Sequence, residues 1–162
     1  MNNLNHFNTC GEAYMVNIGP KQASNRKATA SGKILMNKKT LEIAKSGDSK
    51  KGDIIGVARI AAIQGCKKTS ELIPLCHQVN ITSVDIKFNY LNRPSSITCN
   101  VIVESYGKTG VEMEALTGVQ IGLLTIYDML KGIDRGMIIS DIRLDEKIGG
   151  KSGHWKKPNP KK

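Results

Sequence analysis

The chain has 162 residues, of which 40% are hydrophobic and 23% charged, and a formal net charge of +10 at pH 7. This length suits one domain with its own core, and the composition is typical of a globular protein, which excludes intrinsic disorder. The longest uncharged apolar-rich run, 115–127, is shorter than the roughly 20 residues of a membrane-spanning helix, and the N-terminus has neither a signal nor a transit pattern, so we expect a cytoplasmic protein. We expect a single domain over 1–162, with a folded core over about 11–150.

The first part of the chain predicts a strand followed by two helices. Residues 26–36 alternate loosely between apolar and polar and indicate a strand, and 38–45 have the composition of a short helix. Small apolar residues recur near helical spacing over 53–67, where Asp53 occupies the position of an N-cap. The alanines of this second helix favour close packing on a sheet.

Two alternating runs joined by a turn predict a β-hairpin. The runs cover 81–91 and 97–104, and 92–95 has the composition of a turn. The apolar faces of the two runs consist of Val84, Ile86, Phe88 and Tyr90, and of Ile97, Cys99, Val101 and Val103. Ile102 falls on the opposite face, and an apolar residue there hints that a second subunit covers it.

A long helix and a last strand complete the expected order of elements. The helix covers 112–132, and the strand covers 138–144 with Ile138, Ser140, Ile142 and Leu144 on one side. The order β–α–β–β–α–β predicts an α+β domain of the ferredoxin-like kind, with helices on one face of an antiparallel sheet. We expect it to be oligomeric, because the open sheet face must be wetted or covered.

The positive charge is concentrated in two stretches. Residues 151–162 hold five lysines and no acid, which indicates a basic flexible tail, and 21–51 hold nine Lys or Arg against Glu42 and Asp48. Such a balance favours anionic partners, although solvated surface lysines explain it equally well. No pair among the four cysteines has zinc-ligand spacing, so we expect reduced thiols and no metal site.

Asp128 is the most informative single residue, because it is a lone carboxylate among apolar residues of the long helix. Lys131 lies at i+3 and can pair with it. Two interpretations stay open at this point. The pair is either a structural contact at a helix end, or a desolvated carboxylate and amine that face a cavity and transfer protons.

Three loops could contact a ligand. His77 is the one histidine within the expected core, and such a loop histidine either donates to a phosphate or satisfies local backbone groups. Residues 107–110 open the long helix ahead of two glutamates, where anions bind or where the carboxylates accept from N–H groups. Residues 149–153 (GGKSG) resemble the end of a P-loop but lack its first glycine and its helix, so they indicate a flexible arm over a phosphorylated ligand.

Six motifs are similar to those of one family: KGD at 51–53, ARIA at 58–61, LIPLCH at 72–77, GKTGVEMEALT at 107–117, TIYDM at 125–129 and GGKSG at 149–153. On these motifs the chain resembles the molybdenum cofactor biosynthesis protein C (MoaC) family, the cyclic pyranopterin monophosphate synthases. The similarity extends from about Gly11 to Trp155. Asn17, Gln78 and Leu130 depart from the residues usual in the family, and none of them is a site residue that the resemblance implies.

The resemblance implies a lyase of molybdenum cofactor biosynthesis that converts 3′,8-cyclo-7,8-dihydroguanosine 5′-triphosphate to cyclic pyranopterin monophosphate and releases diphosphate. It implies a homohexamer, a trimer of dimers with sites at the dimer interfaces, and no nucleic-acid or membrane partner. It implies no bound cofactor, and leaves open whether Mg²⁺ accompanies the triphosphate. Carried over by position, the catalytic residues are Asp128, Lys51 and Lys131, and the substrate-binding residues are Leu75, Cys76, His77, Glu112, Met113, Glu114, Lys147 and Arg26.

Two alternatives come from other classes of protein. A basic βαββαβ domain also describes the RNA-recognition fold, but aromatic residues are only 4% of the chain and 97–104 contain none. A scaffold subunit without chemistry has no need of a desolvated Asp128 and Lys131. Both alternatives are therefore weaker than the enzyme hypothesis.

Overall fold

The computed structural model describes residues 6–46, 52–151 and 153–158. Its elements in chain order are β1 (Ser24–Leu35), α1 (Lys38–Ser46), α2 (Ile54–Lys67), α3 (Thr69–Leu72), β2 (Ile81–Asn92), β3 (Ser95–Gly107), α4 (Glu112–Leu130), β4 (Ile138–Ile148) and β5 (Trp155–Lys156). Within the described ranges the strands form a five-stranded antiparallel sheet in the order β2-β3-β1-β4-β5. The predicted α+β class is confirmed, and the main elements follow the predicted order.

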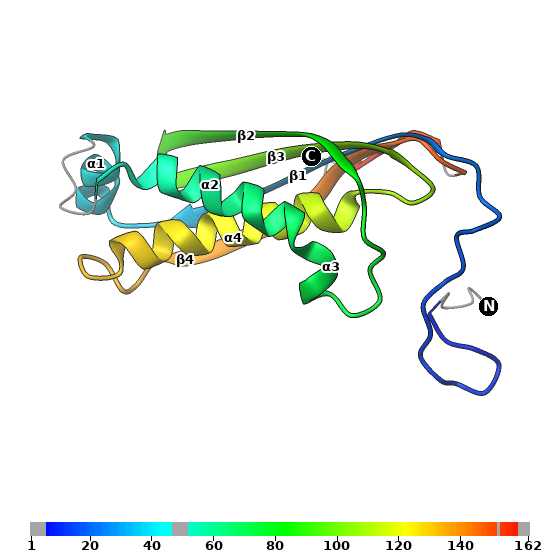
Figure 1. Cartoon of the computed structure of the whole chain (residues 1–162). Coiled ribbons are helices and arrows are strands. Elements are labelled where there is room, and N and C mark those ends of the chain that lie inside the picture. Colours follow the sequence, from blue (N-terminus) through cyan, green and yellow to red (C-terminus); the bar gives the residue numbers. More distant parts are fainter. Residues whose placement is uncertain (1–5, 47–51, 152, 159–162) are drawn as a thin grey trace.

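The helices α2 and α4 lie side by side on one face of the sheet, while α1 sits at one end of it (Figure 1). The N-terminal segment extends beyond the opposite end, next to the beginning of α4 (Figure 1). No helix in the described part of the chain is long and apolar enough to cross a membrane.

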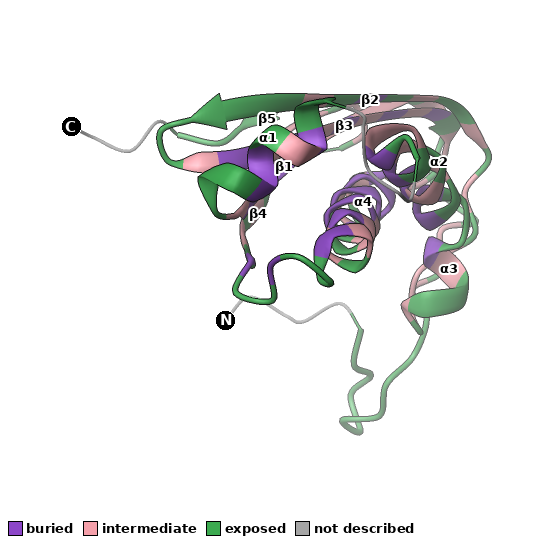
Figure 2. Ribbon diagram, turned by 90° about the vertical axis from the view of Figure 1, so that its left-hand side faces the viewer, coloured by how far each residue is buried: buried purple, intermediate pink, exposed green. Residues whose placement is uncertain are grey.

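Residues without large side chains bring α4 close to its neighbours. A Cβ atom on Gly118 would lie 2.5 Å from Cys66 Sγ of α2, and one on Gly122 would lie 3.2 Å from Ala62 Cβ. Gly65 of α2 makes the reciprocal approach, because a Cβ there would lie 2.9 Å from Ile121 Cγ1 of α4. The buried residues therefore gather between the two helices and the sheet (Figure 2).

The predicted N-cap of α2 is confirmed: the Asp53 side chain accepts a 2.8 Å hydrogen bond from the Gly56 backbone N–H. The hairpin of β2 and β3 also has the predicted faces. Ile97, Cys99, Val101 and Val103 are fully buried under the helices, while Ile102 is half-buried on the opposite face, opposite Asp85.

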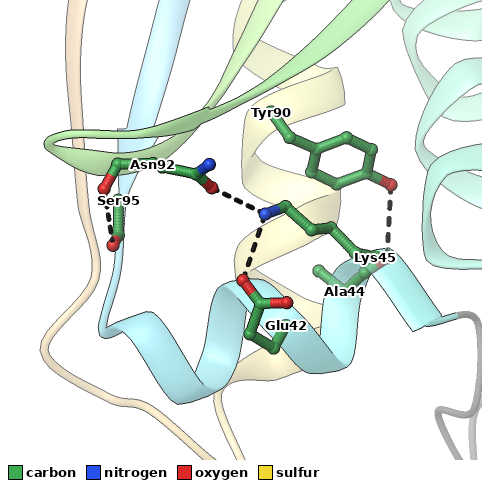
Figure 3. A network of polar contacts seen from close by, with 6 residues as sticks. All are labelled: Glu42, Ala44, Lys45, Tyr90, Asn92 and Ser95. Atoms are coloured by element: carbon green, nitrogen blue, oxygen red, sulfur yellow. Dashed lines mark hydrogen bonds and ion pairs between the residues drawn. The ribbon is translucent and has the colours of Figure 1, made fainter.

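A polar network joins α1 to the tip of this hairpin (Figure 3). The Tyr90 hydroxyl donates to the Ala44 carbonyl over 3.2 Å, and Lys45 Nζ donates to Asn92 Oδ1 over 2.7 Å and to Glu42 Oε1 over 3.1 Å. These contacts fix the carboxyl end of α1 to the sheet.

The predicted faces of β4 are wrong in its first half. Ile138 is 61% exposed, and Ile139 packs against the core instead, together with Ile142. The cause is a β-bulge in β4, between the residues that pair with Ser31 and Lys33 of β1. Asp141 lies in this bulge and has φ 56°. The extra residue reverses the alternation, which a period-two reading of the sequence cannot anticipate.

A second bulge and a longer strand follow. The strand continues to Ile148, beyond the predicted end at 144, and its register shifts again between the partners of Thr29 and Ala30. Lys147 consequently pairs with the fully buried Ala28, on the face that carries the helices. The short strand β5 then pairs Trp155 with Lys147 along the outer edge.

Gly32 lies opposite the first bulge and makes a testable contact. A Cβ atom there would lie 2.8 Å from Val119 Cγ1 and 3.0 Å from Leu123 Cδ1, so Gly32→Ala overpacks the core. We expect a loss of about 1–3 kcal/mol in the free energy of unfolding, measured by chemical denaturation. Gly107→Ala is the control, because no atom lies within 4 Å of a Cβ at that position. An equal effect of both substitutions would contradict the packing argument.

Candidate active site

Two adjoining cavities open at the amino end of α4. Their volumes are about 950 Å³ and 420 Å³, and both are lined by Lys21, Thr109, Gly110 and Glu112. Glu112 is the first residue of α4, so the helix start forms the boundary between the two cavities. We call them the basic cavity and the mixed cavity.

The basic cavity collects cations from segments that are distant in the sequence. Among the described residues its charged lining consists of Glu112 and six basic side chains: Lys21, Arg26, Lys27, Lys108, Lys147 and Lys151. Lys147 Nζ lies 2.9 Å from Glu112 Oε1, and both side chains are partly buried. This excess of positive charge suits an anionic ligand such as a phosphate group.

Arg26 is held at the edge of this cavity by backbone groups. Its Nε donates to the Gly107 carbonyl over 3.2 Å, and its guanidinium lies against Gly150. Gly149 and Gly150 have φ values of 99° and 73°, which L side chains rarely adopt, so glycine is needed at both positions. The first two glycines of the GGKSG motif therefore pack against Arg26, next to the cavity.

The mixed cavity contains fewer charges. It is lined by Leu75, Cys76, His77, Met113 and Glu114, which the sequence placed together as substrate-binding residues, and also by His6, Val16, Ile18 and Val79. Sequence analysis missed the side chains of the N-terminal segment. Lys108 binds this segment through a 2.5 Å hydrogen bond from its Nζ to the Gly19 carbonyl, a contact without a local sequence signal.

Glu114 and Cys76 are influenced by their burial in this cavity. Desolvation raises the pKa of the Glu114 carboxyl, its own backbone N–H lowers it, and the nearby Glu112 raises it. Desolvation and then the charge of Glu114 raise the pKa of the Cys76 thiol. A protonated carboxyl group can donate a hydrogen bond as well as accept one. The raised pKa keeps Cys76 as a thiol and argues against a nucleophile.

Asp128 and Lys131 lie at the other end of α4. Asp128 Oδ1 is 2.6 Å from Lys131 Nζ, so the predicted pair exists. From Glu112 to Asp128 the helix rises about 24 Å at roughly 1.5 Å per residue. Lys131 lines a separate cavity of about 350 Å³ with Tyr127, Gly132 and Arg135.

The predicted desolvation of this pair is wrong for the single chain. The side chains of Asp128 and Lys131 are 61% and 55% exposed, because they project from the side of α4 that neither the sheet nor α2 covers. Leu124, one turn earlier on α4, is also exposed, so the apolar stretch is not evidence of burial on every side. The hydrogen bond with Asp128, followed by its charge, raises the pKa of Lys131.

Lys51, the third predicted catalytic residue, lies outside the described residues. Within the described ranges, no three His, Cys, Asp or Glu side chains are grouped so that they could hold a metal ion.

These features define a class: an α+β domain with a positively charged cavity and a less charged one at the amino end of its central helix. The model of the MoaC family matches residues 15–150, and the chain belongs to the MoaC family. This membership assigns it to molybdenum cofactor biosynthesis and indicates an enzyme of that pathway.

The contact between Gly150 and Arg26 can be tested with an anion. Gly150→Ala places a Cβ against the guanidinium, which must leave its position beside Gly107. We expect inorganic pyrophosphate to bind roughly tenfold more weakly by calorimetry, which corresponds to about 1.4 kcal/mol.

The matched control for this variant is Gly153→Ala. Gly153 also has a positive φ, 63°, but no atom lies within 4 Å of a Cβ there. It imposes a similar backbone strain without displacing Arg26, so binding should stay near that of the unchanged chain. Equal affinities for the two variants would refute the positioning of Arg26 by Gly150.

The burial of Glu114 predicts a pH-dependent stability. Its pKa is raised above the ordinary value of 4.5, so the folded chain binds more protons than the unfolded chain as the pH rises through this range. The free energy of unfolding therefore decreases over that window. Glu114→Gln removes the titration, and its stability relative to the unchanged chain should increase from pH 4 towards pH 8 in denaturant titrations. Glu104→Gln is the control, because it replaces an exposed carboxylate instead of a buried one.

Proposed function

We propose that this chain is a cyclic pyranopterin monophosphate synthase, a lyase that converts 3′,8-cyclo-7,8-dihydroguanosine 5′-triphosphate to cyclic pyranopterin monophosphate and diphosphate. The observation that carries the proposal is the meeting of the basic and mixed cavities at Glu112. A triphosphate suits the first cavity, and a guanine-derived ring suits the second. Their combined size is ample for a nucleotide, since ligand sites commonly measure roughly 300–1,000 Å³.

In the basic cavity, the reaction forms the cyclic phosphate. A hydroxyl group derived from the ribose attacks the α-phosphorus and gives its proton to a basic group of the site. The bond from this phosphorus to the bridging oxygen of the β-phosphate breaks, and diphosphate leaves with the bonding electron pair. Lys147 and Arg26 line this cavity, and their role in the proposal is to stabilise the charge on the phosphates. We propose no resident cofactor, and Mg²⁺ would enter only with the triphosphate.

In the mixed cavity, the ring is bound and rearranged. Opening the imidazole ring and closing the pterin require several proton transfers. Glu112 and Glu114 can accept hydrogen bonds from ring N–H groups, a protonated Glu114 can donate one to a ring carbonyl, and the His77 imidazole can donate or accept one. Leu75, Cys76 and Met113 supply the surface against which the ring packs.

Asp128 and Lys131 are proposed to act with Lys51 as the acids and bases of the reaction, but they must come from a second subunit. Within one chain, the length of α4 keeps Asp128 too far from Lys147 to share one substrate. The exposed apolar residues Val57 and Ile60 of α2 and Leu124 of α4 provide a surface for a subunit contact. Such a contact would desolvate the exposed pair and complete the site.

We therefore propose ferredoxin-like subunits that assemble as a homohexamer, a trimer of dimers with one composite site at each end of a dimer interface. A twofold contact uses the same surface on both subunits and so creates two equivalent sites.

The first experiment measures diphosphate and pterin product from the purified protein and the cyclised GTP derivative. The unchanged protein should turn over, and Asp128→Asn should reduce turnover below detection while the fold, followed by circular dichroism, stays intact. Absence of product from the unchanged, well-folded protein would overturn the proposed function. Normal turnover by Asp128→Asn would overturn the role of Asp128.

A mixing experiment tests the composite site. Asp128→Asn and Lys147→Ala should each be inactive as pure assemblies. Co-expressed in equal amounts, they should regain about a quarter of the unchanged activity, because half of the randomly formed dimers contain one site with both original residues. If one chain supplied both residues, the mixture would stay inactive.

A further inference from the structure

Asp134 is a buried carboxylate that the proposed chemistry does not use. It is 6% exposed and lies in the loop between α4 and β4, which runs past the amino end of α1 (Figure 2). Burial of a carboxylate is costly unless hydrogen bonds compensate it. In the described part of the chain, no salt bridge to Asp134 is present. Its role must therefore be sought in its hydrogen bonds.

The two oxygens of Asp134 face different parts of the structure. Oδ2 accepts from the Asn37 backbone N–H over 2.9 Å and from Thr40 Oγ1 over 3.2 Å, at the first turn of α1. Oδ1 accepts from the Gly136 backbone N–H over 3.0 Å, within its own loop. The carboxylate thus joins the loop after α4 to the start of α1.

A short hydrogen-bonded turn connects Asp134 to Lys131. The backbone N–H groups of Ile133 and Asp134 both donate to the Leu130 carbonyl, over 2.8 Å and 3.1 Å. The backbone N–H of Lys131 donates to the Tyr127 carbonyl over 2.8 Å. The Tyr127 hydroxyl closes the turn from the other side, because it donates to the Arg135 carbonyl over 3.1 Å. Few torsions between Asp134 and Lys131 therefore remain free.

The pair of Asp128 and Lys131 depends on this turn. Both side chains are more than half exposed, so the position of the Lys131 amine depends mainly on the backbone that carries it. The charged or titratable groups nearest to Lys131 are Asp128 and Tyr127 on α4 and Arg135 in the loop.

We propose that Asp134 is a positioning residue that holds the Lys131 amine against Asp128 by anchoring the turn after α4 to α1. The inference rests on the proposed function for its catalytic consequence, but not for its structural content. Asp134 touches neither cavity at the amino end of α4 and acts through Lys131 alone.

The test uses Asp134→Ala in the full-length assembly. The truncation removes both carboxylate oxygens, so Asn37 and Thr40 at the start of α1 lose their acceptor in the turn and the anchor is lost. We expect kcat to fall about tenfold, since small misplacements of catalytic groups are costly, while KM for the cyclised GTP derivative stays within about twofold. In ¹³C-lysine NMR, the Lys131 amine should titrate at lower pH than in the unchanged protein.

The control is Val101→Ala, a truncation of a fully buried side chain in the middle of β3. It should lower the melting temperature without altering kcat or the titration of Lys131. If Asp134→Ala lowers the melting temperature but leaves both readouts unchanged, Asp134 has a structural role only and the proposal is wrong. If the unchanged protein makes no product, the proposed function fails, and the titration of Lys131 still decides the role of Asp134.

Discussion

The close contact of α4 with α2 and the sheet determines where both ends of this helix lie. Gly118, Gly122 and Gly65 leave no room for a side chain, and Gly32 does the same from the sheet below. Because protein interiors are packed as tightly as crystals of small organic molecules, a helix held in this way cannot slide or turn without clashes. The start of α4 at Glu112 and its end near Asp128 are thus fixed by contacts in its middle.

The two cavities differ in chemistry although they share the first turn of α4. Cations gather on the side of β1 and β4, whereas the side of the 75–77 loop contains a thiol, an imidazole and the protonatable Glu114. Glu112 faces Lys147 and so limits how far the positive potential extends along the helix start. A ligand with one strongly charged end and one neutral, hydrogen-bonding end matches this division better than a uniformly charged one.

Sequence reasoning was accurate where an element buries one face in a regular pattern. The hairpin and the cap of α2 depend on neighbouring residues, so their periodicity and spacing predicted them. The faces of β4 could not be predicted in this way, because the bulge at Asp141 inserts an extra residue relative to β1, and a period-two pattern carries no signal of such an insertion. The position of Lys147 depends on a second register shift, and only its resemblance to a family motif indicated it.

The residues of the candidate site were predicted from family motifs more than from hydrophobic patterns and charge. The apolar neighbours of Asp128 suggested burial. A sequence pattern, however, cannot distinguish a helix face that packs in the core from one that is exposed on the single chain. Lys21 lines both cavities because Lys108 binds the N-terminal segment at Gly19. A contact between residues so far apart in the sequence leaves no local periodicity. No sequence motif indicates the role of Asp134 either, since its hydrogen-bond partners at the start of α1 are distant in the sequence.

The short strand β5 carries a natural fluorophore next to the basic cavity. The chain contains one tryptophan, Trp155, and it pairs with Lys147 while 40% of its surface stays in contact with solvent. Indole fluorescence responds to nearby charge and to the exclusion of water. Indole emission from the unmodified protein therefore originates at a single place, beside a lysine of the cavity, and needs no attached dye to be assigned.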